Sequence, residues 1–143
     1  MTDRRTGRSG RLRVLITMLG LDQHEAGSLA VTRILRDAGI EVVYGGRFNL
    51  PEAIAEIAVQ EDVDVVGVSC HSWEFLYYAQ ELGGLLHAAD PPIPIVVGGS
   101  VVTPSDRQEV LAKGIDAAVL PGGSEAEIVE TFYALADGRE PAV

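Results

Sequence analysis

Five short runs of aliphatic and β-branched residues constrain the fold of this chain more than any other feature. They occupy residues 12–17, 40–44, 63–69, 93–97 and 117–120. The runs are continuously apolar and do not alternate with polar residues. This pattern is typical of strands that are buried on both faces, as in a parallel sheet.

A helical pattern follows each run. The predicted helices span residues 28–38, 51–60, 74–88, 104–112 and 124–136. Gly39 is a suitable residue to end the first helix, and Pro51 suits the opening of the second. Ser124 and Glu127 have the spacing of a capping box at the start of the fifth. The alternation predicts an α/β domain with a flavodoxin-like (Rossmann-like), doubly wound, five-stranded parallel sheet in the order 2-1-3-4-5.

Charge and composition exclude several classes of function. The net charge of −10 argues against nucleic-acid binding, which needs a basic surface. No apolar run is long enough to span a membrane, so we expect no membrane association. The single cysteine, Cys70, and the lack of a signal sequence predict a cytoplasmic protein. We expect one domain at 12–138, with a disordered basic tail at 1–11 and a short tail at 139–143.

The loops that follow the strands are the expected place for a site. Sheets of this kind bind ligands beyond the carboxyl ends of their strands, at the switch point between strands 1 and 3. In the first of these loops, Asp22 lies two residues before His24. The carboxylate can accept the Nδ1 proton and leave Nε2 free to ligate a metal or to act as a base. From these residues alone, a solvated surface histidine remains the alternative.

The whole set of loops resembles one known family. Asp22, His24 and Gly27 form the DxHxxG signature of cobalamin-binding domains, placed after the first strand as in that family. The family's other markers are also in place: Ser69 after the third strand, Gly98 and Gly99 after the fourth, and Gly122, Gly123 and Ser124 after the fifth. The resemblance covers residues 12–137. It is greatest to the small subunits of acyl-CoA mutases, such as methylmalonyl-, isobutyryl- and 2-hydroxyisobutyryl-CoA mutase.

This resemblance implies a cofactor and a set of contacts. The cofactor would be adenosylcobalamin, with His24 as the axial ligand of cobalt in place of the cofactor's own dimethylbenzimidazole (base-off, His-on). Asp22 would orient His24, and Ser69 would hydrogen-bond the displaced base. The freed nucleotide arm would lie between the sheet and the first and last helices. The other residues implied to contact the cofactor are Gln23, Gly27, His71, Gly98, Gly99, Gly122, Gly123 and Ser124.

The function implied is that of the small subunit of a carbon-skeleton mutase, an isomerase. No catalytic residue is expected on this chain, because a separate large (β/α)8-barrel subunit would bind the substrate. Two residues depart from the family pattern: Met18 stands where acyl-CoA mutases usually have lysine, and His71 stands where leucine is usual.

Proteins with three other functions share this fold. A glutamate mutase small subunit and a non-catalytic corrinoid carrier or sensor stay open as alternatives. A receiver-type signalling domain shares the fold, but it needs an aspartate where Ser69 ends the third strand. The receiver function is therefore excluded.

Overall fold

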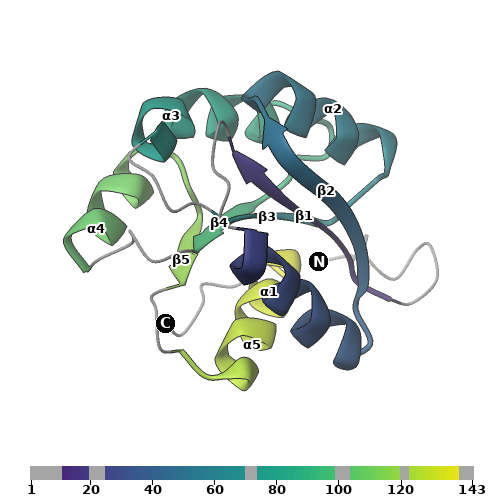
Figure 1. The fold of residues 1–143 in the computed structure, drawn as a ribbon. Helices are drawn as coiled ribbons and strands as arrows, with labels where there is room; N and C mark the ends of the chain where they lie inside the picture. Colours follow the sequence, from purple (N-terminus) through teal and green to yellow (C-terminus); the bar gives the residue numbers. More distant parts are fainter. Residues whose placement is uncertain (1–10, 20–24, 70–73, 99–103, 120–122, 139–143) are drawn as a thin grey trace.

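The computed structural model describes residues 11–19, 25–69, 74–98, 104–119 and 123–138 (Figure 1). The strands are β1 (Arg13–Leu19), β2 (Glu41–Asn49), β3 (Val65–Ser69), β4 (Ile95–Gly98) and β5 (Ala117–Val119). The helices are α1 (Glu25–Asp37), α2 (Pro51–Gln60), α3 (Glu74–His87), α4 (Pro104–Ala112) and α5 (Glu125–Ala136). In this part of the chain, no helix is both long enough and apolar enough to cross a membrane.

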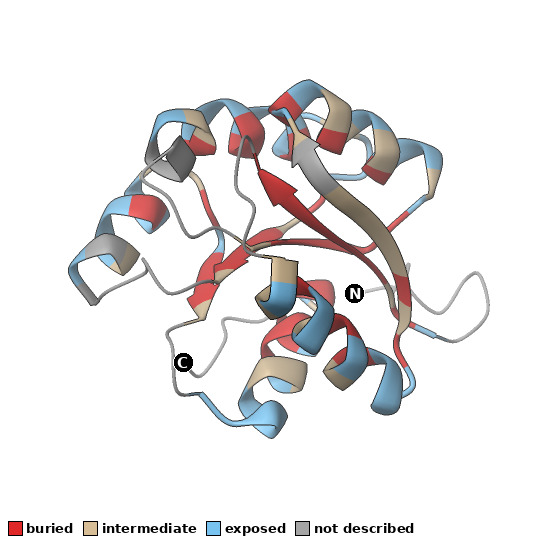
Figure 2. Ribbon diagram, in the orientation of Figure 1, coloured by how far each residue is buried: buried red, intermediate tan, exposed pale blue. Residues whose placement is uncertain are grey.

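The sheet has the predicted topology. Its strands pair in parallel in the order β2-β1-β3-β4-β5, so the flavodoxin-like prediction is confirmed. Helices α2, α3 and α4 cover one face, and α1 and α5 cover the other (Figure 1). Successive strand residues alternate between two apolar clusters: Leu15 and Val66 pack under α2 and α3, whereas Val14 and Val65 pack under α1 and α5. Figure 2 shows the resulting buried sheet between helices whose outer faces are exposed.

Two aspartates each join the amino ends of two neighbouring strands through a pair of hydrogen bonds. Asp64, just before β3, donates its backbone N–H to the Arg13 carbonyl at 2.7 Å. Its carboxylate accepts the Arg13 N–H at 2.9 Å. Asp116, just before β5, makes the same two contacts with Ile95 of β4, at 3.0 and 2.8 Å. Each aspartate thereby satisfies a strand-end amide that has no partner in the ladder, and it fixes the register at the start of the pair.

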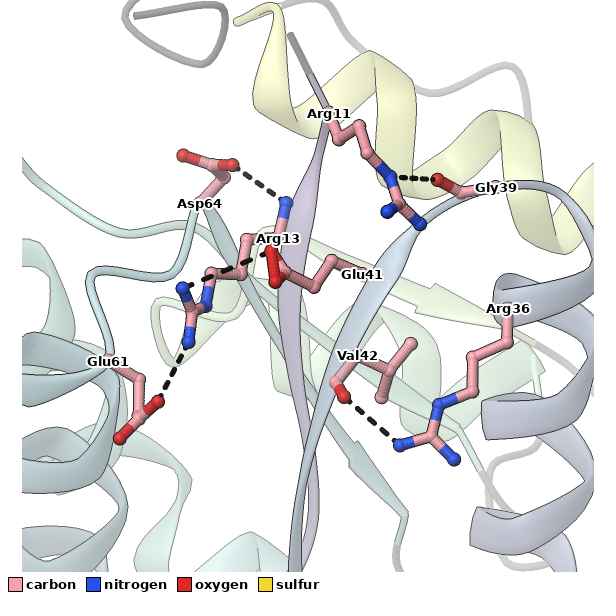
Figure 3. A network of polar contacts seen from close by, with 8 residues as sticks. All are labelled: Arg11, Arg13, Arg36, Gly39, Glu41, Val42, Glu61 and Asp64. Atoms are coloured by element: carbon pink, nitrogen blue, oxygen red, sulfur yellow. Dashed lines mark hydrogen bonds and ion pairs between the residues drawn. The ribbon is translucent and has the colours of Figure 1, made fainter. Parts of the chain in front are cut away.

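Charged side chains gather at this amino end of the sheet (Figure 3). The Arg13 guanidinium lies between Glu61, at 2.9 Å, and Glu41, at 3.9 Å. Arg11 donates from Nε to the carbonyl of Gly39, which lies in the turn between α1 and β2 with φ of 86°. A side chain from just before β1 thus satisfies a carbonyl group of that turn.

Most predicted boundaries agree with the structure to within about two residues, and two differ by more. The first helix begins at Glu25, three residues before the predicted Ser28. An acidic residue is favourable in the first turn of a helix, and Gly27 is tolerated there. The second strand continues to Asn49, beyond the predicted end at residue 44. Gly45 and Gly46 follow the predicted end, and they form an irregularity within the strand, where the pairing register shifts.

Gly67 of β3 has no room for a side chain. A Cβ there would lie 2.7 Å from Cδ1 of Ile16 and 2.9 Å from Cζ of Phe132 on α5. Gly84, in α3, is exposed, and a Cβ there meets nothing within 4 Å. The two glycines therefore offer a matched pair of substitutions.

We expect Gly67→Ala to lower the free energy of unfolding by about 1–3 kcal/mol through overpacking. Gly84→Ala should raise it by about 0.5–1 kcal/mol, because alanine favours an exposed helix. Urea denaturation followed by circular dichroism measures both. A Gly67→Ala protein as stable as the wild type would contradict the close approach of Phe132 to β3.

Candidate functional site

The carboxyl ends of four strands form one row across the sheet. Met18 pairs with Ser69, and Ser69 pairs with Gly98. Gly98 in turn pairs with Val119. Because the strands are parallel and in this register, the segments that follow β1, β3, β4 and β5 all start at one edge. That edge is where the sequence predicted the site.

Five of the predicted cofactor contacts fall on described residues. Gly27 lies in the first turn of α1, and Ser69 and Gly98 end β3 and β4 side by side. Gly123 and Ser124 precede α5, and Ser124 caps it by accepting the Glu127 N–H at 3.1 Å. Asp22, Gln23, His24, His71, Gly99 and Gly122 lie outside the described residues. Their predicted roles stay predictions.

Met18 stands at the position where the resemblance implied by the sequence has lysine. Its side chain is fully buried, beside Ser69 in the register. Methionine satisfies such an apolar position without a partner, whereas a lysine there would need its charge compensated. The departure therefore agrees with the local packing of this chain.

A polar network that sequence reasoning missed holds the ends of β1 and β2. The buried Thr17 donates its hydroxyl to the Gly46 carbonyl at 3.1 Å and accepts from Asn49 Nδ2 at 2.7 Å. The same Asn49 amide donates to the Gly45 carbonyl at 2.9 Å. A Cβ on Gly45 would lie 2.9 Å from the Thr17 hydroxyl. These contacts thus hold the irregular end of β2 in one conformation. The adjacent glycines Gly45 and Gly46 were the sequence signal that could have indicated it.

A second contact joins β2 to the start of α1. The Tyr44 hydroxyl donates to the Glu25 carboxylate at 2.5 Å. Glu25 is the first residue of α1 and directly follows His24. This bond fixes the first turn of the helix against the sheet, and it therefore fixes where the preceding segment must end.

The layer between the sheet and helices α1 and α5 contains hydroxyl groups. Both helices pack against β3 and against one another. Ser28 and Thr32 on α1, and Thr131 on α5, are all buried there. Thr32 donates to the Ser28 carbonyl and Thr131 to the Glu127 carbonyl, each within its own helix. The Ser28 hydroxyl has no hydrogen-bond partner among the described residues.

These features fit the cofactor that the resemblance implies. A buried hydroxyl without a partner costs free energy, and a bound polar group would remove that cost. A layer of small hydroxyl residues suits the polar nucleotide arm of a corrinoid better than a fully apolar core would. Among the described residues, no group of three or more His, Cys, Asp or Glu could hold a metal ion. A corrinoid needs only one protein ligand, and the predicted one, His24, lies outside those residues.

His87 lies at the opposite end of the sheet from this row. Its Nε2 is 2.8 Å from the Asp116 carboxylate, and both side chains are partly exposed. This contact joins the last residue of α3 to Asp116, the residue before β5.

Comparison with protein families gives a match over most of the chain. Residues 12–129 match the B12 binding domain. The chain is 37% identical to the pivalyl-CoA mutase small subunit of Xanthobacter autotrophicus, over 87% of this chain and 83% of that one. It is 34% identical to the 2-hydroxyisobutanoyl-CoA mutase small subunit of Aquincola tertiaricarbonis, over 90% and 94%. It is also 33% identical to methylmalonyl-CoA mutase of Escherichia coli, over 78% of this chain but only 16% of that enzyme.

Solved structures share the fold at low sequence identity. A cobalamin-binding protein from Desulfitobacterium hafniense superimposes with a TM-score of 0.74 at 20% identity, covering 87% of this chain and 59% of that one. The signal receiver domain of the response regulator NarL from Mycobacterium tuberculosis gives 0.69 at 19% identity, covering 90% and 98%. These likenesses establish the fold alone. Ser69 is the last residue of β3, so the position where a receiver needs aspartate holds serine, as the sequence indicated.

We expect Tyr44→Phe to loosen the first turn of α1. The substitution keeps the ring and removes the bond to Glu25, which should cost about 1–2 kcal/mol because the acceptor is a carboxylate. Hydrogen exchange measured by mass spectrometry should become faster at the start of α1. Tyr77→Phe is the control, because Tyr77 is 76% exposed on α3. Unchanged exchange in the Tyr44 variant would show that this bond does not hold the turn.

Proposed function

The chain belongs to the family of B12 binding domains, and from that membership we propose that it is the cobalamin-carrying small subunit of an adenosylcobalamin-dependent acyl-CoA mutase, an isomerase. The observation that carries the proposal is its match, over nearly the full length of both chains, to two mutase small subunits. Both are named for CoA thioester substrates. This favours the acyl-CoA class over the glutamate mutase alternative.

We propose that the chain binds the cofactor base-off, with the His24 imidazole as the cobalt ligand. Imidazole is a suitable ligand for first-row metals. Asp22 accepts the other ring N–H, which fixes the tautomer and raises the basicity of the ligating nitrogen. Tyr44 supports this arrangement, because its hydroxyl bonds the carboxylate of Glu25, the residue after His24. The chemistry that adenosylcobalamin supplies when bound is the adenosyl radical that starts a 1,2-rearrangement.

The other proposed contacts hold the nucleotide arm and the corrin edge. Ser69, beside Gly98 in the register, donates to the displaced benzimidazole. Glycines let the backbone approach the cofactor closely. The residues proposed for this role are Gly27, Gly98, Gly99, Gly122 and Gly123, with Gln23, His71 and Ser124 as polar contacts.

We propose a large (β/α)8-barrel subunit as the partner that binds the acyl-CoA substrate. The described residues form one α/β layer structure and contain no barrel. The carboxyl edge of the sheet would then face the partner, with the corrin between the two chains. Turnover therefore requires both subunits. Mutase activity of this chain alone would contradict the division of labour.

His24→Ala should abolish the His-on state. Wild-type protein with adenosylcobalamin is expected to give the absorption spectrum of a base-off, histidine-ligated cofactor. After reduction to the Co(II) form, the electron paramagnetic resonance lines should change from triplets to doublets when the protein contains 15N-histidine. Both signatures should be absent from His24→Ala.

His87→Ala is the matched control, because His87 lies at the amino end of the sheet. It should retain both signatures. Retention of the nitrogen splitting in His24→Ala, or its loss in His87→Ala, would refute the assignment of the ligand.

A further inference from the structure

Ser28 is an unusual residue within the α1–α5 layer. Its side chain is fully buried, yet its hydroxyl has no hydrogen-bond partner among the described residues. The two neighbouring buried hydroxyls are both satisfied: Thr32 donates to the Ser28 carbonyl at 2.8 Å, and Thr131 donates to the Glu127 carbonyl at 2.9 Å. Buried polar groups are almost always paired in folded proteins. An unpaired one indicates a missing partner.

The position of Ser28 narrows the chemistry of that partner. Ser28 lies in the first turn of the 13-residue α1, one residue after Gly27. Together with Thr32 and Leu35 it forms the face of the helix that packs inward. The N–H groups at the start of a helix have no partner within the helix, and they favour acceptor oxygens. A ligand that enters here would meet those N–H groups and the Ser28 hydroxyl together, so it should present oxygen acceptors.

Glu25 places a carboxylate in the first turn of α1. Its Oε2 accepts a hydrogen bond from the Tyr44 hydroxyl of β2, so this oxygen already has a partner. The ion pair that joins α1 to α5, Arg33 with Glu125, is long at 3.8 Å and exposed. An exposed pair of this kind contributes little to stability. This ion pair therefore does little to hold the outer ends of the two helices together.

We propose that the Ser28 hydroxyl hydrogen-bonds an oxygen of the ribose–phosphate of the cofactor's nucleotide arm. This inference rests on the proposed function, because it takes the arm to be buried between α1, α5 and β3. It adds a specific role for a residue outside the DxHxxG signature. The apo protein carries the unsatisfied hydroxyl, and the bound arm satisfies it.

Three corrinoids separate the contributions of the arm. Cobalamin carries phosphate, ribose and base; cobinamide phosphate lacks ribose and base; cobinamide lacks all three. Dissociation constants are measured for each by titration against the wild type and against Ser28→Ala. Ser105→Ala is the control, because Ser105 is an exposed serine in the first turn of α4.

Ser28→Ala should weaken cobalamin binding by about three- to tenfold, the range expected for one hydrogen bond. Cobinamide binding should be unchanged. Loss of affinity for cobinamide phosphate would assign the bond to the phosphate, and loss for cobalamin alone would assign it to the ribose. Ser105→Ala should bind all three corrinoids like the wild type.

Stability of the apo protein gives an independent readout. Because Ser28→Ala removes a buried group without a partner, its urea midpoint should equal or exceed that of the wild type. A lower midpoint would mean that the hydroxyl supports the apo fold, and it would overturn the proposal. An unchanged preference of Ser28→Ala for cobalamin over cobinamide would also overturn it. If the wild type itself showed no such preference, the proposed burial of the arm would fail as well.

Discussion

The hydrogen-bonded register of the parallel sheet is the constraint on which the rest of the structure depends. It aligns Met18, Ser69, Gly98 and Val119 across four strands. Asp64 and Asp116 set the register from the other end, where each pairs its own backbone and carboxylate with the first residue of a neighbouring strand. A shift of one residue in any pair would turn its side chains to the opposite face. The candidate site would then lose its alignment.

The amino and carboxyl ends of the sheet contain different kinds of side chain. Charged contacts concentrate at the amino end, where Arg13 meets Glu61 and His87 meets Asp116. The carboxyl end instead has small residues and neutral polar groups, with Thr17 and Asn49 among them. These charged contacts thus lie away from the edge where the site is proposed. The proposed ligand-binding edge contains glycines and an irregular strand end instead, as is common where loops carry a site.

The two helical layers differ in a corresponding way. The layer of α2, α3 and α4 packs large aliphatic side chains against the sheet. The layer of α1 and α5 also has an apolar core around Leu35 and Phe132, but hydroxyl residues lie beside it. An apolar layer resists opening because separation exposes it to water. Polar groups within a layer offer hydrogen bonds to a ligand that enters it. The asymmetry therefore supports the proposal that the cofactor arm lies on the α1–α5 face of the sheet.

The sequence by itself determined the class of fold, the strand order and the family. The reason is that continuous apolar runs, caps such as Ser124 and the DxHxxG spacing are local patterns that need no tertiary information. The tertiary structure decided what depends on pairs distant in the chain: the bond of Tyr44 to Glu25, the bulged end of β2 around Thr17, and the unpaired hydroxyl of Ser28. Apart from the glycine pair in β2, no local pattern marks these residues, because a hydrogen bond between β2 and α1, or the lack of one, arises only when packing brings the two elements together. The start of α1 and the end of β2 were placed wrongly for the same reason: Glu25 bonds Tyr44, and Asn49 bonds Thr17, each far away in the chain.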